Sequence, residues 1–209
     1  MKLTSDSFQH EQRIPEQFAF GAHDPVLHIR LAANHNPHLK WSDAPAGTRS
    51  FVIVCVDPDA PSLPDDVNKE GRVLHHDLPR ANFYHWVMVD IPAHITEIAA
   101  GSCSSGIVAG GKRDLAGPPG SRQGINDYTS WFQNDTDMAG TYRGYDGPCP
   151  PRNDMRVHRY HFTVYALDRE RVPIEGEDFT APQVLEVIQP LVLAEARLTG
   201  TYAINPDAG

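Results

Sequence analysis

The sequence predicts a loop-rich, mainly β protein. Eighteen prolines and sixteen glycines among 209 residues are more than a bundle of helices would be expected to carry, because both residue types interrupt helices. Three runs rich in β-branched and aromatic residues, at 50–56, 85–91 and 158–167, have the composition of buried strands. No internal repeat or low-complexity tract interrupts the chain.

Charge and hydropathy disfavour several functional classes. Lys and Arg number 18 against 27 Asp and Glu, a formal net charge of −9, so we expect no nucleic-acid partner. No apolar run approaches the roughly 20 residues of a membrane span, and residues 1–10 lack the apolar segment of a secretory signal. The three cysteines have no metal-type spacing and are typical of reduced thiols, so we expect a cytoplasmic protein.

The first two strands are each expected to end at proline. The run 50–56 should stop at Asp57, because two prolines in the next four residues cannot continue a central strand. Residues 62–82 are polar and are expected to form an extended loop before the second strand, 85–91. Residues 101–153 show no strong periodicity and are rich in Gly, Pro, Asp and Ser, which is typical of functional loops.

The C-terminal part follows the third strand and is predicted to contain one helix. Thr180 has the character of an N-cap before Pro182. The apolar pattern predicts a helix that continues to Ala196, kinked or divided at Pro190. A last short strand is expected over 198–204.

Polar residues begin or end the apolar face of each predicted strand. Asp57 ends the face of the first strand, and His85 and His158 begin those of the second and third. If the first strand runs antiparallel to the other two, these residues meet at one edge of the core. The imidazoles and the Tyr160 hydroxyl would then donate to an anion in a small pocket. The alternative is that each histidine merely caps its strand.

Four motifs follow one another in a fixed order over residues 50–168: Asp57-Pro58-Asp59-Ala60-Pro61, Tyr84-His85-Trp86, Gly147-Pro148-Cys149-Pro150-Pro151 and His158-Arg159-Tyr160. This ordered set resembles the signature of the phosphatidylethanolamine-binding protein family, also called the Raf kinase inhibitor protein family. Segments 36–41 and 200–202 resemble its bacterial branch. The resemblance covers nearly the whole chain, so we expect a single domain over residues 1–209.

The resemblance implies a β fold of two antiparallel sheets with a few peripheral helices, one of them near the C-terminus. It also implies a pocket at one end that binds a small anion or a phosphate-bearing head group such as phosphoethanolamine. We expect no catalytic residue, metal or cofactor. Ten residues match the pocket positions: Asp57, Pro58, Asp59, Pro61, His85, Trp86, Gly147, Pro151, His158 and Tyr160. On the same grounds the Ala60–Pro61 bond is a candidate cis peptide. Loops 62–82 and 114–142 are longer than expected and are predicted to overhang the pocket.

Three alternatives stay open. Asp57, His85 and His158 have the chemistry of a hydrolase acid and base, although no serine or cysteine nucleophile signature is present. Residues 75–77 (His-His-Asp) are zinc-ligand types near His85, at a spacing that matches no template, and a solvated loop is the simpler interpretation. The kinase-inhibitor resemblance implies a kinase- or protease-inhibitor-like module with a protein partner, and the C-terminal helix is a candidate homodimer surface.

Overall fold

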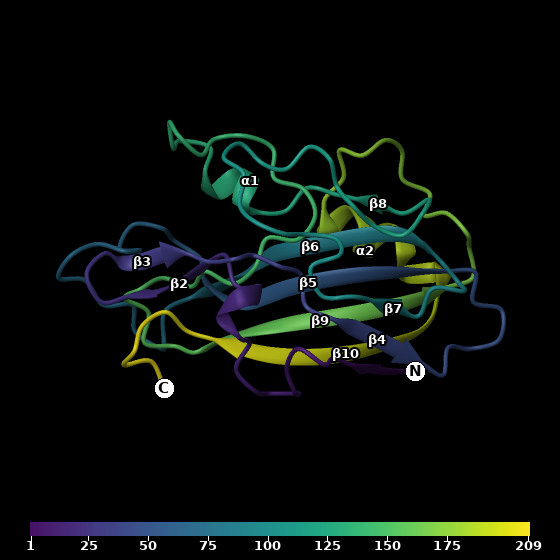
Figure 1. The fold of residues 1–209 in the computed structure, drawn as a ribbon, viewed down its shortest axis with the longest axis horizontal. Coiled ribbons are helices and arrows are strands. Elements are labelled where there is room, and N and C mark those ends of the chain that lie inside the picture. Colours follow the sequence, from purple (N-terminus) through teal and green to yellow (C-terminus); the bar gives the residue numbers. More distant parts are fainter.

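The computed structural model describes all 209 residues, and its centre is an antiparallel sheet in the strand order β10-β9-β5-β6-β8. A second sheet has the order β1-β4-β7, and β2 and β3 form a separate hairpin (Figure 1). The strands are β1 (Lys2–Thr4), β2 (Gly21–Asp24), β3 (His28–Leu31), β4 (Leu39–Ser42), β5 (Ser50–Pro61), β6 (Arg80–Pro92), β7 (Glu97–Ile98), β8 (Arg122–Gln123), β9 (His158–Leu167) and β10 (Val192–Tyr202). The helices are η1 (Glu16–Phe18), α1 (Tyr128–Trp131), α2 (Ala181–Ile188) and η2 (Gln189–Leu191). The predicted mainly β fold with two antiparallel sheets and a helix near the C-terminus is confirmed.

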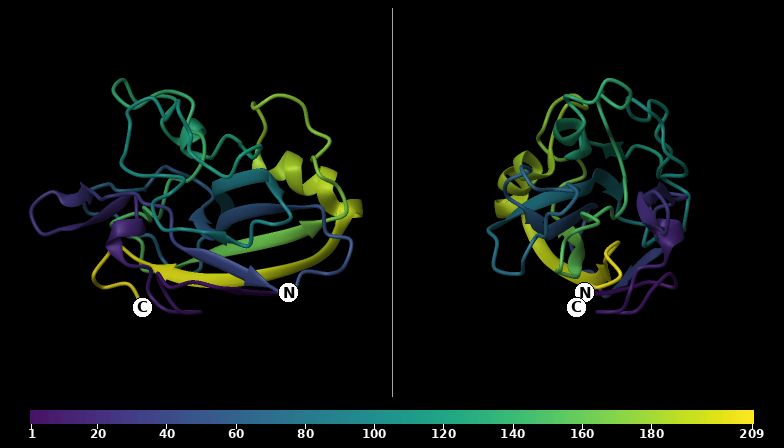
Figure 2. Two further views of the ribbon diagram at one scale, coloured as in Figure 1. Left: turned by 45° about the vertical axis from the view of Figure 1, so that its right-hand side comes forward. Right: turned by 90° about the vertical axis from the view of Figure 1, so that its left-hand side faces the viewer.

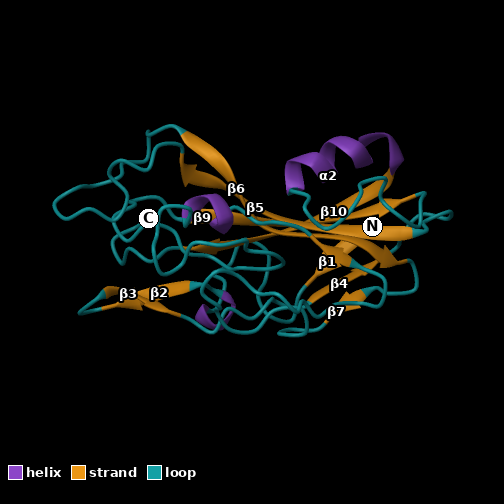
Figure 3. Cartoon of the chain, turned by 90° about the horizontal axis from the view of Figure 1, so that it is seen from above, coloured by secondary structure: helices purple, strands orange, loops and turns teal.

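Two apolar layers lie on opposite faces of the central sheet. One packs Val52, Val54 and Val87 against helix α2. The other packs Phe51 and Ile53 against the small sheet. Figure 3 shows α2 on one side of the central strands and β1, β4 and β7 on the other. The central strands are therefore buried on both faces, which explains their nearly continuous apolar sequences.

Strand β5 continues past the point where the prolines were expected to end it. It pairs with β9 only from Ser50 to Val56, and beyond that its partner is β6 alone, as far as Pro61 opposite Arg80. A proline is tolerated there because one edge of the strand no longer needs a ladder donor. The structure contains no cis peptide bond, so the expectation of a cis Ala60–Pro61 bond is wrong. The chain instead stays extended through this bond.

The predicted side-chain faces hold for two of the three central strands. Alternation is regular along β9, but β6 is interrupted by bulges: Cys55 pairs with Trp86 and Val56 with Tyr84, which leaves His85 as the extra residue. His85 and Trp86 consequently contact the same face of the sheet, where both meet buried tyrosines. The predicted common face of His85 with Val87 and Val89 is therefore wrong, because both valines pack in the opposite layer, whereas Ile91 returns to the layer of Trp86 after a second register shift.

The C-terminal helix is shorter than the apolar pattern predicted. It begins after Thr180, whose capping box with Gln183 is present, and α2 ends at Ile188 before the single turn η2 that contains Pro190. The chain then enters β10 at Val192, so the expected continuation to Ala196 is wrong. Proline removes a helical donor, and pairing along β9 is available from Val192 onward.

The long loops gather above the sheet and at one end of it. Between Ile98 and His158 the structure contains only β8 and the single turn α1, as expected for loops. In Figure 2 these loops rise above the central sheet, and the β2–β3 hairpin projects at one end. No helix in the structure has both the length and the apolar character needed to cross a membrane.

Candidate functional site

A cavity of about 290 Å³ lies at the end of the central sheet where β5 ends and β6 and β9 begin. Because β5 runs antiparallel to both neighbours, Asp57 comes from the same end of the sheet as His85 and His158. The predicted convergence of these three residues is confirmed. His85, His158 and Tyr160 line the cavity directly, and Asp57 lies behind them, bonded to His158.

His85 offers one ring nitrogen to the cavity. Its Nδ1 donates to the backbone oxygen of Asp146 at 2.8 Å, and no hydrogen bond to the protein involves Nε2. Burial lowers the pKa of His85 and outweighs the opposing effect of the Asp57 charge. In this neutral ring Nδ1 holds the proton, so Nε2 carries a lone pair. Binding of an aprotic anion at Nε2 therefore requires His85 to take up a proton.

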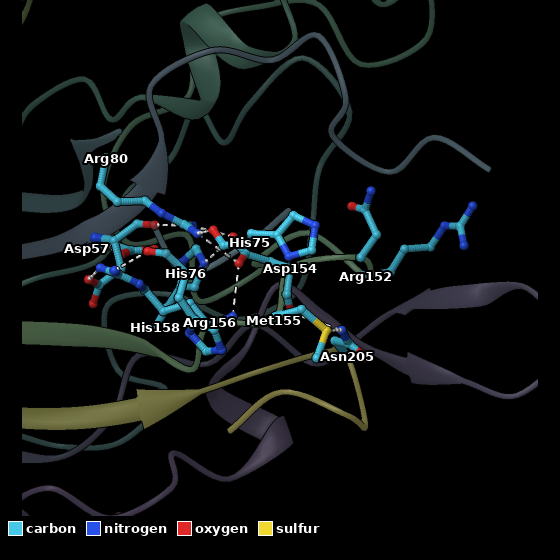
Figure 4. A network of polar contacts seen from close by, with 12 residues as sticks. Asp57, His75, His76, Arg80, Arg152, Asp154, Met155, Arg156, His158 and Asn205 are labelled. Carbon is cyan, nitrogen blue, oxygen red and sulfur yellow. Dashed lines mark hydrogen bonds and ion pairs between the residues drawn. The ribbon is translucent and has the colours of Figure 1, made fainter. Parts of the chain in front are cut away.

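His158 has both ring nitrogens engaged by carboxylates. Nδ1 lies 2.7 Å from Asp57 Oδ2 and Nε2 lies 3.0 Å from Asp154 Oδ2, as Figure 4 shows. Burial by itself lowers the pKa of His158, but the charges of Asp57 and Asp154 and their hydrogen bonds outweigh it and raise the pKa to about 9. His158 is thus a cation at neutral pH, and it supplies positive charge to the cavity rather than a free N–H.

Arginines balance the remaining carboxylates behind the cavity. Arg80 is buried, donates to both oxygens of Asp154 and also to the backbone oxygen of Asp59 at 2.9 Å. Burial raises the pKa of Asp59, but hydrogen bonds from Arg159 and Arg156 outweigh this and hold the pKa well below its usual range. The network therefore combines four cationic side chains with three carboxylates: His158, Arg80, Arg156 and Arg159 against Asp57, Asp59 and Asp154.

The Tyr160 hydroxyl is buried and has no hydrogen-bond partner. Its ring packs edge-on to the His85 ring, with 5.2 Å between the centroids. Burial raises the pKa of Tyr160 well above its usual value, so the hydroxyl keeps its proton and remains a donor. Buried polar atoms are nearly always paired, so this hydroxyl is an exception, and it belongs to a residue that lines the cavity.

The walls and rim of the cavity are mainly apolar. Tyr128 stacks on Phe20 and on Phe132, with centroid distances of 4.5 and 5.6 Å, and Phe83 packs edge-on to it. Cys149 joins this wall, and burial raises the pKa of its thiol to about 12, so it stays protonated. Further apolar lining comes from the β2–β3 hairpin, the segment 62–79 and helix α1: Ile29, Leu31, Val67 and Trp131.

Comparison with known proteins agrees with this fold and this order of motifs. The sequence profile of the phosphatidylethanolamine-binding protein family matches residues 4–203. The chain belongs to the phosphatidylethanolamine-binding protein family. Among bacterial relatives, YbhB of Escherichia coli is 34% identical over 177 residues, which cover 84% of this chain and 83% of YbhB. A relative from Methanothermobacter thermautotrophicus is 31% identical over 97% of this chain and 98% of its own.

Solved structures of the family share this architecture. The crystal structure of E. coli YbcL, described as a new member of the mammalian family, superposes with a TM-score of 0.68 at 27% identity and covers 96% of both chains. A homologue from Chlamydia trachomatis superposes with a TM-score of 0.64 at 25% identity, over 97% of this chain and 96% of its own. The family resemblance stated from the four motifs is thus confirmed.

Half of the ten family-matched residues line the cavity: Pro61, His85, Pro151, His158 and Tyr160. Asp57 and Asp59 lie behind it and hold its charged residues in place. Pro58, Trp86 and Gly147 do not line it. Trp86 is fully buried and donates to Gln123 Oε1 at 2.6 Å. At Gly147 a Cβ atom would lie 2.1 Å from the Phe18 backbone oxygen, so this glycine permits a close approach of two chains.

Two residues of the site were not predicted from the sequence. Asp154 and Arg80 are buried together and hold the far nitrogen of His158, yet each stands in or next to a polar segment that suggests solvation. Asp154 precedes His158 by four residues, but in a loop that spacing indicates no contact. Only the burial of Asp154 in the folded protein shows that it belongs to the site, because a buried carboxylate needs a partner for its charge.

The histidines at 75 and 76 contact the arginines through their backbone rather than their rings. The oxygen of His75 accepts from Arg80, and that of His76 from Arg156. No group of three or more His, Cys, Asp or Glu side chains in the chain is arranged to hold a metal ion. The zinc alternative therefore gains no support from the arrangement of these residues.

Proposed function

We propose that the protein binds a small anion or a phosphate-bearing head group in the cavity at the end of the central sheet, and performs no chemistry on it. The observation that carries the proposal is the buried, unpaired hydroxyl of Tyr160, whose ring packs against that of His85, a histidine with a free Nε2. Both residues line the cavity, together with the His158 cation. The name of the family agrees with a phosphate-bearing ligand.

The unpaired Tyr160 hydroxyl carries an energetic cost that a ligand would relieve. A buried donor without an acceptor costs about 1–3 kcal/mol, and a ligand oxygen at this place would recover that energy. Hydrogen bonds to a charged acceptor are stronger than neutral ones. The cations behind the cavity further lower the cost of bringing a negative charge into an apolar space. A binding protein of this kind needs neither a metal nor a cofactor.

The same side chains do not favour hydrolysis. His158 holds its proton between Asp57 and Asp154, which keeps it from serving as a base near neutral pH. Cys149, the thiol of the cavity, stays protonated. The proposal accordingly assigns no catalytic residue. We place the protein in the cytoplasm, where the three free thiols would stay reduced. Binding of a small ligand in the cavity is compatible with a regulatory protein partner that binds elsewhere on the surface.

Isothermal titration with inorganic phosphate tests the proposal. Tyr160→Phe and His85→Gln should each weaken binding about tenfold, because each removes one polar contact with a charged ligand. Tyr165→Phe is the matched control, since Tyr165 lies on the same strand but packs with the opposite apolar layer. If both cavity variants bind phosphate as the wild type does, the cavity is not the site. Hydrolysis of p-nitrophenyl phosphate that His85→Gln abolishes would favour the enzyme alternative instead.

A further inference from the structure

Asp146 is joined to His85 through both of its backbone polar groups. Its N–H donates to the backbone oxygen of His85 at 3.1 Å, and its own oxygen accepts from His85 Nδ1 at 2.8 Å. The second bond places the proton of the neutral ring on Nδ1 and leaves Nε2 with a lone pair. The position of Asp146 therefore determines which nitrogen of His85 remains free.

The carboxylate of Asp146 is held by three largely buried side chains. Oδ1 accepts from Asn34 Nδ2 at 2.7 Å and from Lys112 Nζ at 2.6 Å, and Oδ2 accepts from Asn126 Nδ2 at 2.8 Å. The side chains of Asp146 and Lys112 are only 2% and 10% exposed. Buried ion pairs contribute little to stability, because the cost of desolvation cancels most of their attraction. Stability alone is therefore a weak reason for an ion pair at a residue bonded to His85.

The charges that act on His85 come from strands β5 and β9 and from Asp146. Burial by itself lowers the pKa of His85, whereas the charges of Asp57 and Asp146 and the hydrogen bond to the Asp146 backbone raise it, and the charge of His158 lowers it further. Asp57 and His158 pair with each other at 2.7 Å. Asp146 is then the remaining carboxylate that acts on His85, and Lys112 is the cation paired with it. Three uncharged rings also pack against His85, and burial raises the pKa of the two tyrosines among them well above its usual value: Phe83, Tyr128 and Tyr160.

We propose that Asp146 is a positioning residue of the anion site. Together with Lys112 it fixes the ring of His85 and sets the pH at which this ring takes up the proton that an aprotic anion requires. The charge of Asp146 favours the protonated ring, and Lys112 opposes this effect by neutralising the carboxylate. The inference rests on the proposed function and specifies how proton uptake is regulated at the same site.

The tautomer of His85 in the wild-type protein provides the first test. Heteronuclear NMR spectra of the isotope-labelled imidazoles distinguish a proton on Nδ1 from one on Nε2, and the His85 signals are identified by their absence in His85→Gln. We expect the proton on Nδ1 at pH 8. A proton on Nε2 at this pH would overturn the inference, because Nδ1 could then not donate to Asp146.

Titration of the same signals measures the effect of the two charges. Asp146→Asn should lower the titration midpoint of His85 by about one pH unit, because it removes a negative charge. Lys112→Met should raise the midpoint by about the same amount, because the carboxylate loses its cation but keeps the hydrogen bonds from Asn34 and Asn126. Lys40→Met is the matched control and should leave the midpoint unchanged, since Lys40 pairs with Glu97 on the small sheet and its loss alters the net charge equally.

Shifts of opposite sign distinguish this role from a purely structural one, because loss of packing would disturb His85 in the same way in both variants. An unchanged midpoint in either folded variant, or two shifts of the same sign, would overturn the inference. If neither variant folds, the wild-type tautomer alone decides. Isothermal titration of the wild type with sulfate and phosphate tests the proposed function separately. Failure of both anions to bind overturns that function whatever the midpoints, whereas binding with unshifted midpoints overturns the inference alone.

Discussion

His85 and His158 both stand beside the cavity, but their hydrogen bonds give them opposite charge states. Burial keeps His85 neutral, with one nitrogen bonded to a backbone oxygen and the other free. Two carboxylates keep His158 protonated. His158 thus supplies a standing positive charge, and His85 supplies a nitrogen whose proton can arrive with the ligand. Tyr160 adds a donor that stays protonated at any physiological pH.

This division of roles predicts that anion binding is linked to proton uptake at His85. Sulfate does not titrate between pH 5.5 and 8, so any change in its affinity over that range comes from the protein. We expect sulfate to bind more tightly as the pH falls, by up to about tenfold per pH unit while His85 of the free protein remains neutral. Isothermal titration across this range measures the effect. His85→Gln should bind sulfate weakly with a much smaller pH dependence, and an unchanged slope in this variant would contradict the role given to His85.

At the scale of elements, the segment 62–79 forms part of the cavity wall because the loop after Pro151 holds it. Asn153 donates to the backbone oxygens of Asp66 and Arg72 and accepts from the backbone N–H of Asn68. Val67 and Asn68 in turn line the cavity. The prediction that the loops after Ser62 and Asp114 lie over the pocket agrees with this arrangement, since Trp131 and Phe132 of the second loop also line it.

Asn153→Ala should therefore loosen the segment 62–79 without unfolding the sheet. Three hydrogen bonds to the backbone of this segment are lost, so we expect faster amide exchange in peptides covering residues 66–74, measured by hydrogen exchange with mass spectrometry. Peptides from β9 should exchange as in the wild type. Asn82→Ala is the control, because Asn82 is exposed and forms only one long contact, to Tyr84. Unchanged exchange over 66–74 in Asn153→Ala would show that other contacts hold the segment.

At the scale of the whole molecule, the ionic network links residues far apart in the sequence, and folding alone brings them together. Asp57 and His158 are 101 positions apart, and Arg80 and Asp154 are 74 apart. Free energy of unfolding should consequently depend on pH through this network. The pKa of His158 is raised in the folded protein to about 9 from the ordinary value near 6.5. The contribution of His158 to the free energy of unfolding is therefore fully present below about pH 6.5 and is lost as the pH rises through about 9.

Denaturant unfolding at pH 6.5 and pH 9 measures this contribution, at about 1.4 kcal/mol per pKa unit. We expect the wild type to lose stability over this interval and Asp154→Asn to lose less, since removal of one carboxylate lowers the pKa of His158. The variant should also be less stable at pH 6.5, because Arg80 and His158 each lose a charged partner. Asp178→Asn is the matched control, since Asp178 is exposed and pairs only with Arg143. Parallel curves for the wild type and Asp154→Asn would contradict the linkage.

Local pattern determined much of the fold and the identity of the family. The apolar runs located β5, β6 and β9 because strands that are buried on both faces have nearly continuous apolar sequences. Thr180 correctly indicated the start of α2, where it forms a capping box. The end of β5 at Pro61 and the start of β10 at Val192 were not predicted. The first depends on pairing with β6 alone and the second on pairing with β9, and neither kind of pairing can be recognised in the local sequence. Asp57, His85 and His158 were predicted to converge from alternation and antiparallel pairing alone.

Tertiary structure decided what those convergent residues can do. The sequence could not indicate that both nitrogens of His158 are occupied, because Asp154 and Arg80 are charged residues of ordinary polar segments that only packing buries. Nor could it indicate that Trp86 lies outside the cavity, since the bulge at His85 depends on the register with β5. Composition and order of motifs thus determine the family, the sheet and the three polar residues at its end. Burial and long-range pairing decide which of their atoms remain free to bind.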